Sequence, residues 1–172
     1  MSYETIIYEK RGNVGVVRLN RPERMNAVIE QMYLDLQAVL EEARADGEVR
    51  ALLLTGSVRV KNGVEKQAFC AGADLKKHAT GERTHADKRN YILLAHETCR
   101  LMHEFELPIV AAINGPARGA GSEMALACDL VLVADGASIG FPETSLATFV
   151  GGGVTSHLPE VVGIARAKEL IY

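Results

Sequence analysis

Short apolar runs alternate along the chain with longer segments in which apolar residues recur at helical spacing. The short runs end near glycine, asparagine or aspartate, as β-strands followed by turns do, and they cover residues 5–10, 14–19, 51–56, 108–114 and 130–135. The first two runs flank the turn at 11–13 and predict a hairpin. The run ALLLTG at 51–56 is apolar at successive positions, which predicts a strand buried on both faces.

Helical periodicity covers two long segments, 28–45 and 84–105. In each of them apolar side chains return every three or four residues, so each predicts a helix with one buried face. The glycine turn that starts at residue 115 predicts a third helix ending near residue 128, and the polar residues 57–67 predict a loop. Strands that alternate with helices, without a linker, predict one α/β domain over residues 1–172.

The composition excludes several classes of function. The 172 residues are 48% hydrophobic and 24% charged, with a formal net charge of −3, as in ordinary globular proteins. We therefore expect no nucleic-acid partner, and no apolar run is long enough for a membrane span. The N-terminus lacks the features of a signal peptide, and Cys70, Cys99 and Cys128 form no C-x-x-C pair. These features predict a cytoplasmic protein with reduced, buried thiols.

A glutamate, Glu123, lies where a glycine-rich turn leads into a predicted helix. The turn lacks the G-x-G-x-x-G spacing, because Met124 stands where the third glycine would be, and it carries no P-loop lysine. The positive end of a helix stabilises a nearby carboxylate, and unpaired N–H groups there can bind a ligand oxygen. Close packing alone is the other interpretation of these glycines.

A second glutamate, Glu143, follows a short apolar strand and a proline in SIGFPETS. A solvated loop acid is one interpretation. The neighbouring Ile139, Phe141 and Pro142 favour the other, an acid held against an apolar wall with a raised pKa. Two carboxylates beside glycine turns, with the small-residue turn AFCAGADLK at 68–76, suit proton transfer next to a carbonyl that gains negative charge.

Other polar groups give weaker signals. The five histidines form no H-E-x-x-H motif and no cluster, so no metal site is predicted. Three arginines, Arg18, Arg21 and Arg24, surround the turn at 20–27 and are either a solvated surface cluster or phosphate contacts. The glycines at 151–153 favour a turn at a helix start over an anion-binding loop.

Four blocks of the sequence, in this order, resemble the crotonase, or enoyl-CoA hydratase/isomerase, superfamily. They are LNRPERMNA, AFCAGADLK, PIVAAINGPARGAGSEMALACDLVLVAD and IGFPE. The resemblance implies an α/β fold, the crotonase-like spiral of β-β-α turns with two nearly perpendicular sheets flanked by helices. It also implies an acyl-CoA thioester substrate, no separate cofactor because coenzyme A is part of the substrate, and a homo-oligomer, a trimer or hexamer.

The same resemblance implies the site. The backbone amides of Ala73 and Ala120 would form an oxyanion hole, and Glu123 and Glu143 would be the two catalytic acids of a hydratase. The separation of the glutamates, 143 − 123 = 20 residues, matches the hydratase arrangement. Contacts with coenzyme A are implied for Arg24, Met25, Ala27, Ala71, Asp74 and Leu75.

We therefore expect an enoyl-CoA hydratase, which adds water across the C2=C3 bond. Residues 147–154 depart from the hydratase pattern G-x-x-P-x-x-G-G, so a cyclic dienoyl-CoA substrate, an isomerase or another crotonase reaction stays open. The chain ends inside a predicted helix with Ile164, Ala167, Leu170 and Ile171 on its apolar face. Since the family continues with further helices, we expect the C-terminal helical region to be absent, and a non-catalytic acyl-CoA-binding fragment is the third interpretation.

Overall fold

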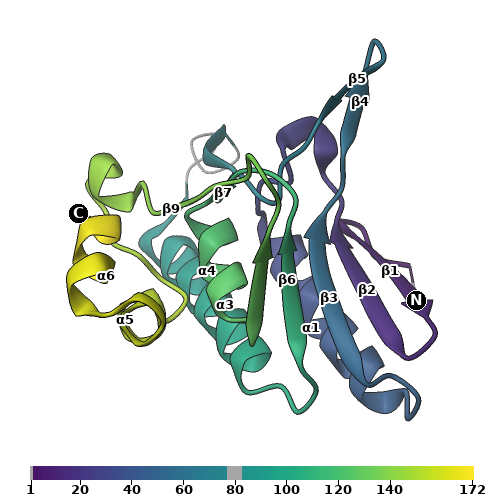
Figure 1. Cartoon of the computed structure of the whole chain (residues 1–172). Coiled ribbons are helices and arrows are strands. Elements are labelled where there is room, and N and C mark those ends of the chain that lie inside the picture. The colour runs from purple at the N-terminus through teal and green to yellow at the C-terminus, as the bar shows by residue number, and fades with distance from the viewer. Residues whose placement is uncertain (1, 77–82) are drawn as a thin grey trace.

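A five-stranded sheet, with strand order β1-β2-β3-β6-β8, forms the centre of the computed structural model, which describes residues 2–76 and 83–172 (Figure 1). β1 pairs antiparallel with β2, and the remaining neighbours pair in parallel. The strands are β1 (Ile6–Arg11), β2 (Val14–Leu19), β3 (Ala51–Gly56), β6 (Ile109–Ile113) and β8 (Leu130–Val133). All five strands predicted from the apolar runs are confirmed.

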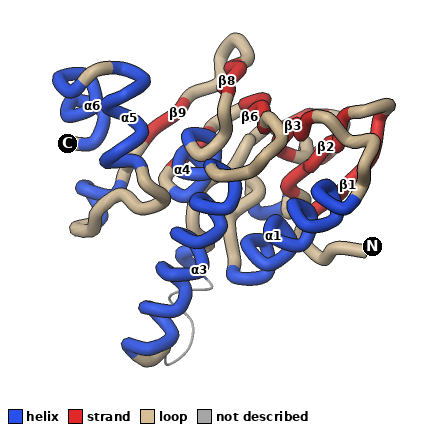
Figure 2. The backbone as a smooth tube through the Cα atoms, turned by 90° about the horizontal axis from the view of Figure 1, so that it is seen from below, coloured by secondary structure: helices blue, strands red, loops and turns tan. Residues whose placement is uncertain are grey.

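Three helices lie on one side of this sheet (Figure 2). They are α1 (Glu30–Ala45), α3 (His85–His103) and α4 (Ala120–Leu126). α1 begins two residues later than predicted, because Val28 forms a β-bridge with Ala73 and Ile29 is extended. α3 begins with a capping box in which Thr84 and Asp87 bind each other's backbone N–H groups, and this arrangement fixes the predicted start of the helix.

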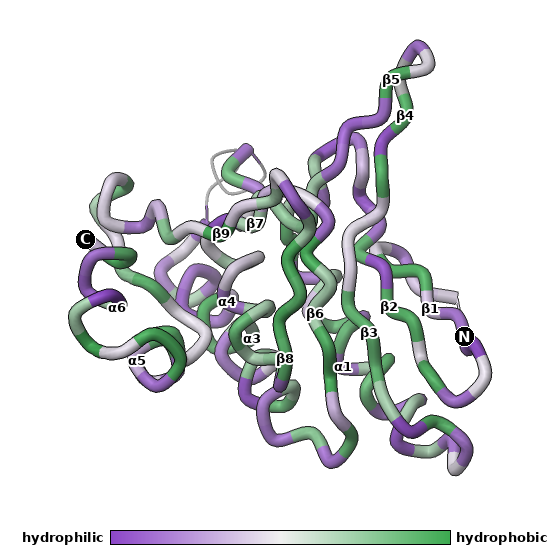
Figure 3. The backbone as a smooth tube through the Cα atoms, viewed as in Figure 1, coloured by the Kyte–Doolittle hydropathy of each residue, from purple (hydrophilic) through white to green (hydrophobic). Residues whose placement is uncertain are grey.

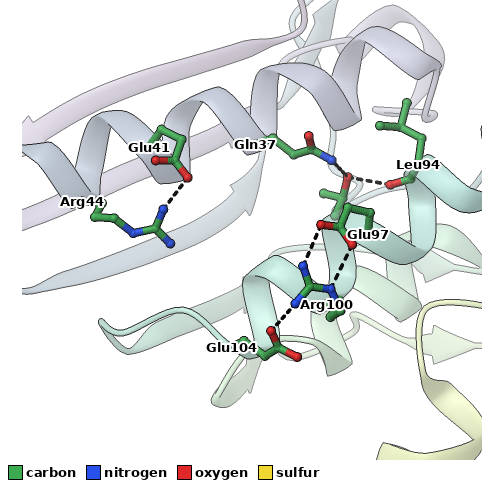
Figure 4. A network of polar contacts seen from close by, with 8 residues as sticks. Gln37, Glu41, Arg44, Leu94, Glu97, Arg100 and Glu104 are labelled. Carbon is green, nitrogen blue, oxygen red and sulfur yellow. Dashed lines mark hydrogen bonds and ion pairs between the residues drawn. The ribbon is translucent and has the colours of Figure 1, made fainter.

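Polar contacts fix how α1 packs against α3 (Figure 4). The side-chain amide of Gln37 on α1 donates to the hydroxyl of Thr98 on α3 at 2.9 Å, and that hydroxyl donates to the Leu94 carbonyl at 2.8 Å. Thr98 is fully buried. An exposed pair on the same helix, Arg100 with Glu97, contributes little stability. The buried contact therefore joins the middle of α3 to α1, while Ala95, Cys99 and Met102 of α3 pack in the main core.

Described residues cover the outer face of the sheet only in part, so the prediction that β3 is buried on both faces is wrong. Leu52 and Leu54 of β3 are buried beneath the helices, whereas Leu53 between them is only half-buried. On the edge strand β8, Leu130 and Leu132 are 60% and 61% exposed, although the strand is strongly apolar (Figure 3). The sequence pattern reports the apolar side chains, but it does not report which of them the helices cover.

Residues 57–67 contain a hairpin instead of the predicted loop. β4 (Arg59–Lys61) pairs antiparallel with β5 (Val64–Lys66). The turn between them is Asn62-Gly63, and both residues have positive φ, 52° and 74°. An Asn-Gly pair with this backbone is the type I′ turn that closes two-residue hairpins. This pair could have predicted the hairpin from the sequence.

A second, smaller sheet brings distant segments together. β7 (Ala117–Arg118) pairs in parallel with β9 (Ile139–Gly140), and Cys70 forms a bridge with Ala117. The bridge between Val28 and Ala73 extends this line of short contacts. The second sheet therefore places the turn at 68–76, the glycine turn before α4 and the segment around Glu143 next to one another.

Two C-terminal helices, α5 (Val154–Val162) and α6 (Ile164–Ile171), lie at the opposite end of the molecule from the N-terminus (Figure 1). They enclose a small apolar cluster that is separate from the main core, formed by Phe141, Val150, Val154, Leu158 and Ala167. Ile164 and Leu170, which the sequence placed on the same apolar face as Ala167, are exposed. Among the described residues, no helix combines the length and the apolar character that a membrane span requires.

Candidate active site

Four predicted site residues, Ala73, Ala120, Glu123 and Glu143, line one cavity of about 310 Å³. The cavity lies between α3, the start of α4, the turn at 71–75 and the segment 142–152. Its wall is otherwise mainly apolar or small, and includes Tyr33, Tyr91, Ile92, Ala95, Leu146 and Phe149. The three segments that the second sheet brings together therefore supply two carboxylates and two backbone amides to the same space.

The two amides are free to bind a ligand. Among the described residues, neither the Ala73 N–H nor the Ala120 N–H donates a hydrogen bond. Ala120 is the first residue of α4, where the N–H has no partner inside the helix. A Cβ atom on Gly72, which has φ +91°, would lie 2.8 Å from the Arg118 carbonyl oxygen and 3.8 Å from the Ala120 nitrogen. The missing side chain at residue 72 therefore lets the two amide-bearing turns approach each other.

The backbone on either side of Ala73 is hydrogen-bonded. Val28 N–H donates to the Gly72 carbonyl at 2.8 Å, and Asp74 N–H donates to the Val28 carbonyl at 2.9 Å. Ala71 N–H donates to the Met25 carbonyl at 3.0 Å. The amide of Ala73 is thus an unpaired donor within a stretch that is otherwise held in place.

Glu123 is 7% exposed, and Gly151 N–H donates to its Oε1 at 2.8 Å. Burial raises the pKa of Glu123, the Gly151 hydrogen bond lowers the pKa, and the nearby Glu143 raises it. The pKa is raised overall, because burial outweighs the hydrogen bond from Gly151. The backbone N–H of Glu123 donates to the Gly119 carbonyl in the first turn of α4.

Glu143 is 8% exposed at the start of the short 3₁₀ helix η2 (Glu143–Leu146), so the interpretation as a solvated loop acid is wrong. Burial raises the pKa of this carboxyl, as the apolar flank predicts. Its Oε2 is buried, and no described residue forms a hydrogen bond with it. A buried carboxyl oxygen without a partner is costly when ionised, and this cost favours the neutral form.

Gly151 is a site residue that the sequence analysis missed. The glycines at 151–153 do precede a helix, as predicted, since α5 begins at Val154. They also bind a carboxylate, because the Gly151 amide holds Glu123. A Cβ atom on Gly152 would lie 2.7 Å from the Glu123 Cβ, so this close contact requires glycine. The three successive glycines marked this segment in the sequence. They did not reveal the partner of Gly151, because Glu123 lies 28 residues earlier in the chain.

Gly119 has a backbone that only glycine adopts easily, with φ 48° and ψ −120°, and a Cβ there would lie 2.6 Å from Glu143 Oε1. We expect Gly119→Ala to lower the free energy of unfolding by about 1–3 kcal/mol and to displace Glu143. The matched control is Gly47→Ala, where nothing lies within 4 Å of the added atom. Urea unfolding of both variants provides the measurement. Equal stability of the two variants would contradict the close contact.

The six residues implied to contact coenzyme A differ in their burial and in whether they line the cavity. Ala71 and Leu75 line the cavity, whereas Asp74 and Ala27 are buried beside it. Asp74 forms an ion pair with Arg21, which makes Arg21 a half-buried structural residue and not part of a solvated cluster. Met25 is half-buried and Arg24 is exposed. The contacts of these six residues with coenzyme A stay predictions.

The structure gives less support to a nucleophilic cysteine or a metal site. Cys70, Cys99 and Cys128 are free and buried, as predicted, and burial raises the pKa of Cys70 and of Cys99 to about 12, so these thiols do not ionise readily. Among the described residues, no group of three or more metal-ligating side chains occurs; His78 lies outside them. His96 also lines the cavity but is exposed, whereas the two glutamates are the buried carboxyls of the cavity.

Comparison with known proteins decides the family. The sequence model described as "Enoyl-CoA hydratase/isomerase" matches residues 9–172. The chain belongs to the enoyl-CoA hydratase/isomerase family. A crotonyl-CoA hydratase of Syntrophomonas wolfei is 36% identical over 173 residues, which cover 100% of this chain and 63% of that protein. A short-chain-enoyl-CoA hydratase of Clostridium acetobutylicum is 34% identical over 172 residues, 100% of this chain and 62% of that protein.

Solved structures of the enoyl-CoA hydratase/isomerase family share the fold. A crystal structure of an enoyl-CoA hydratase from Bacillus anthracis matches with a TM-score of 0.88 at 36% identity, over 98% of this chain and 62% of that one. The predicted crotonase-like α/β fold is therefore confirmed. The chain spans 62 to 63% of the length of the two curated relatives named above. The assignment of residues 1–172 to a single domain stays a prediction.

Proposed function

We propose that this protein is an enoyl-CoA hydratase, which adds water across the C2=C3 bond of a 2-enoyl-CoA thioester. The observation that carries the proposal is one cavity lined by two buried carboxyls with raised pKa values and by two unpaired backbone amides. Crotonyl-CoA and short-chain-enoyl-CoA hydratases among the relatives support the same reaction. The proposal includes no separate cofactor, because coenzyme A enters with the substrate.

The amides would stabilise the charge that develops on the substrate. The thioester oxygen accepts hydrogen bonds from the N–H groups of Ala73 and Ala120, which polarises the conjugated C2=C3 bond. An enolate-like negative charge then develops on this oxygen when water attacks C3. Each preorganised donor of this kind is typically worth about 10² to 10³ in rate.

Burial raises the pKa of both acids and a backbone hydrogen bond lowers each pKa, but only Glu143 has a buried carboxyl oxygen without a partner among the described residues. The Gly151 N–H donates to Glu123, which favours the ionised form, so Glu123 acts as the general base. The unpartnered Oε2 of Glu143 favours the neutral form, so Glu143 acts as the general acid. Water forms its C–O bond at C3 and gives a proton to Glu123, while Glu143 gives a proton to C2. The product is a 3-hydroxyacyl thioester.

A spectrophotometric assay tests this proposal directly. Loss of the conjugated enoyl absorption is followed with crotonyl, longer straight-chain and cyclic dienoyl thioesters of coenzyme A, and the products are separated by chromatography. A 3-hydroxyacyl thioester from any of them supports hydration. A product with a shifted double bond would identify an isomerase instead. Binding without turnover of any substrate would identify an acyl-CoA-binding protein, and the hydratase proposal would be abandoned.

The pH dependence of kcat/KM follows from the two assignments. Because Glu123 works ionised, kcat/KM falls as the pH decreases through its pKa; because Glu143 works protonated, kcat/KM falls as the pH rises through its pKa. Burial raises both pKa values above the ordinary value of about 4.3 for glutamate, so we expect a bell-shaped profile displaced to higher pH. Initial rates measured from acidic to alkaline pH check the prediction. A profile without a falling basic limb would contradict the role of Glu143 as the acid.

A further inference from the structure

We infer that Arg21 is a positioning residue for the oxyanion-hole amide of Ala73, and that it acts through its ion pair with Asp74. This inference rests on the proposed function, since it assigns a role in the proposed oxyanion hole. Arg21 lies 52 residues before Ala73 (73 − 21 = 52) and does not line the cavity. Its effect on the reaction would therefore be indirect.

The contacts of the Arg21 guanidinium tie two segments together. Arg21 Nη2 lies 3.0 Å from Asp74 Oδ2, and the two side chains are only 17% and 9% exposed. Arg21 Nη1 donates to the Ala27 carbonyl oxygen. One planar group thus binds the residue after Ala73 and the residue before Val28, the bridge partner of Ala73. A lysine has a single ammonium group and lacks this planar fork.

Arg21 is itself held by a buried asparagine. Arg21 N–H donates to Asn26 Oδ1 at 3.1 Å, and Asn26 N–H donates to the Arg21 carbonyl at 2.9 Å. The Asn26 side-chain amide also donates to the Ser57 and Ala68 carbonyls, at 3.0 Å and 2.9 Å. Asn26 is fully buried and has a left-handed backbone, with φ 55°. The turn that carries Arg21 is therefore anchored next to the end of β3.

The direction of the Ala73 N–H depends on these contacts. In a trans peptide the N–H points away from the preceding carbonyl. The Gly72 carbonyl points toward Val28, whose N–H it accepts at 2.8 Å. The Ala73 N–H consequently points away from the segment that contains Val28, and Ala73 lines the cavity. Arg21 holds that segment at Ala27 and holds the turn at Asp74, so it links the two segments whose hydrogen bonds orient the Gly72–Ala73 peptide.

The test uses Arg21→Met, Arg21→Lys and Asp74→Asn, with Arg18→Met as the matched control. Arg18 forms a similar ion pair with Glu9, at 3.0 Å, within the hairpin of β1 and β2 and outside the cavity lining. Displacement of reacting groups by about 1 Å can cost 10² in rate. We therefore expect Arg21→Met and Asp74→Asn to lower kcat about 10- to 100-fold with KM changed less than about threefold, and Arg21→Lys to lie between them and the wild type.

Two further measurements separate positioning from folding. A conjugated cinnamoyl thioester of coenzyme A absorbs at longer wavelength when its carbonyl is polarised, so bound to the wild type it should show a red shift. We expect Arg21→Met and Asp74→Asn to bind this probe but to lose more than half of the shift, whereas Arg18→Met retains it. Backbone ¹⁵N relaxation of Gly72, Ala73 and Asp74, without ligand, should show increased motion only in the Arg21 and Asp74 variants.

The outcomes distinguish this inference from the proposed function. If the wild type neither hydrates thioesters nor shifts the probe, the proposed function fails, and the relaxation data alone decide whether Arg21 orders the turn. Folded Arg21 and Asp74 variants with wild-type kcat, red shift and backbone order would overturn the inference. Where Arg21→Met does not fold, Arg21→Lys and Asp74→Asn give the same comparison.

Discussion

Replacing either cavity glutamate by glutamine is expected to lower kcat for hydration by about 10² to 10⁴, the usual contribution of a general acid or base. Glu123→Gln keeps an oxygen that can accept the Gly151 N–H, so the side chain should stay in place while its proton-accepting capacity is lost. Glu143→Gln keeps the size of the side chain but removes the proton that C2 would receive. Steady-state hydration rates on the same enoyl thioester give the measurement.

The stability of the Glu123 variant provides an internal check. A carboxyl whose pKa is raised on folding contributes stability at low pH that is lost as the pH rises through its folded pKa. At neutral pH, Glu123→Gln should therefore be at least as stable as the wild type, and the difference should shrink as the pH falls. Glu4→Gln, at an exposed position, is the control for both properties. Near-normal kcat in either cavity variant would remove that glutamate from the mechanism.

Removal of a single backbone N–H of the proposed oxyanion hole should lower kcat nearly as much as replacement of a cavity glutamate. Ala120 is the first residue of α4, a position at which proline is well tolerated, so Ala120→Pro removes the amide donor with little cost to the helix. We expect Ala120→Pro and Ala73→Pro to reduce kcat by about 10² to 10³ each, because each loses one donor to the thioester oxygen. Initial rates are compared with those of the glycine variants.

The glycine variants separate loss of the donor from loss of the side chain. Ala120→Gly and Ala73→Gly remove the same methyl group but keep the N–H, so they should retain most of the activity. Circular dichroism shows whether the proline variants keep the wild-type secondary structure. Equal activity in a folded proline variant and its glycine counterpart would contradict the role of that amide.

Local sequence patterns predicted the elements well, because each pattern reports on contacts within its own segment. The apolar runs located all five strands of the large sheet, and the periodic apolar stripe over residues 84–105 located α3. Glu123, Glu143 and the glycine turn that starts at residue 115 were also recognised as candidate site residues, with close packing and a solvated loop acid as the other interpretations. The two glutamates and the small-residue turns together suggested one pocket, and the resemblance of four separated blocks to a family implied the role of each residue.

Features that depend on distant partners could not be predicted. The outward side chains of β8 look as apolar as those that the helices cover, and nothing in the strand itself says that they are exposed. Gly151 binds Glu123 across 28 residues of sequence, and Arg21 pairs with Asp74 across 53. The pKa of Glu123 is raised by burial and lowered by the hydrogen bond from Gly151, and that hydrogen bond comes from a distant part of the chain.

The separate apolar cluster of α5 and α6 has a consequence for how the protein responds to heat. Phe141 and Val150 of that cluster adjoin Glu143 and Gly151, whereas Glu123 belongs to a helix whose Met124 lies in the main core. A small cluster of five buried side chains opens at a lower free energy than a large core. On warming, the two carboxyls should therefore separate while the sheet is still folded. Inactivation would then be a local and reversible event, and it would precede melting.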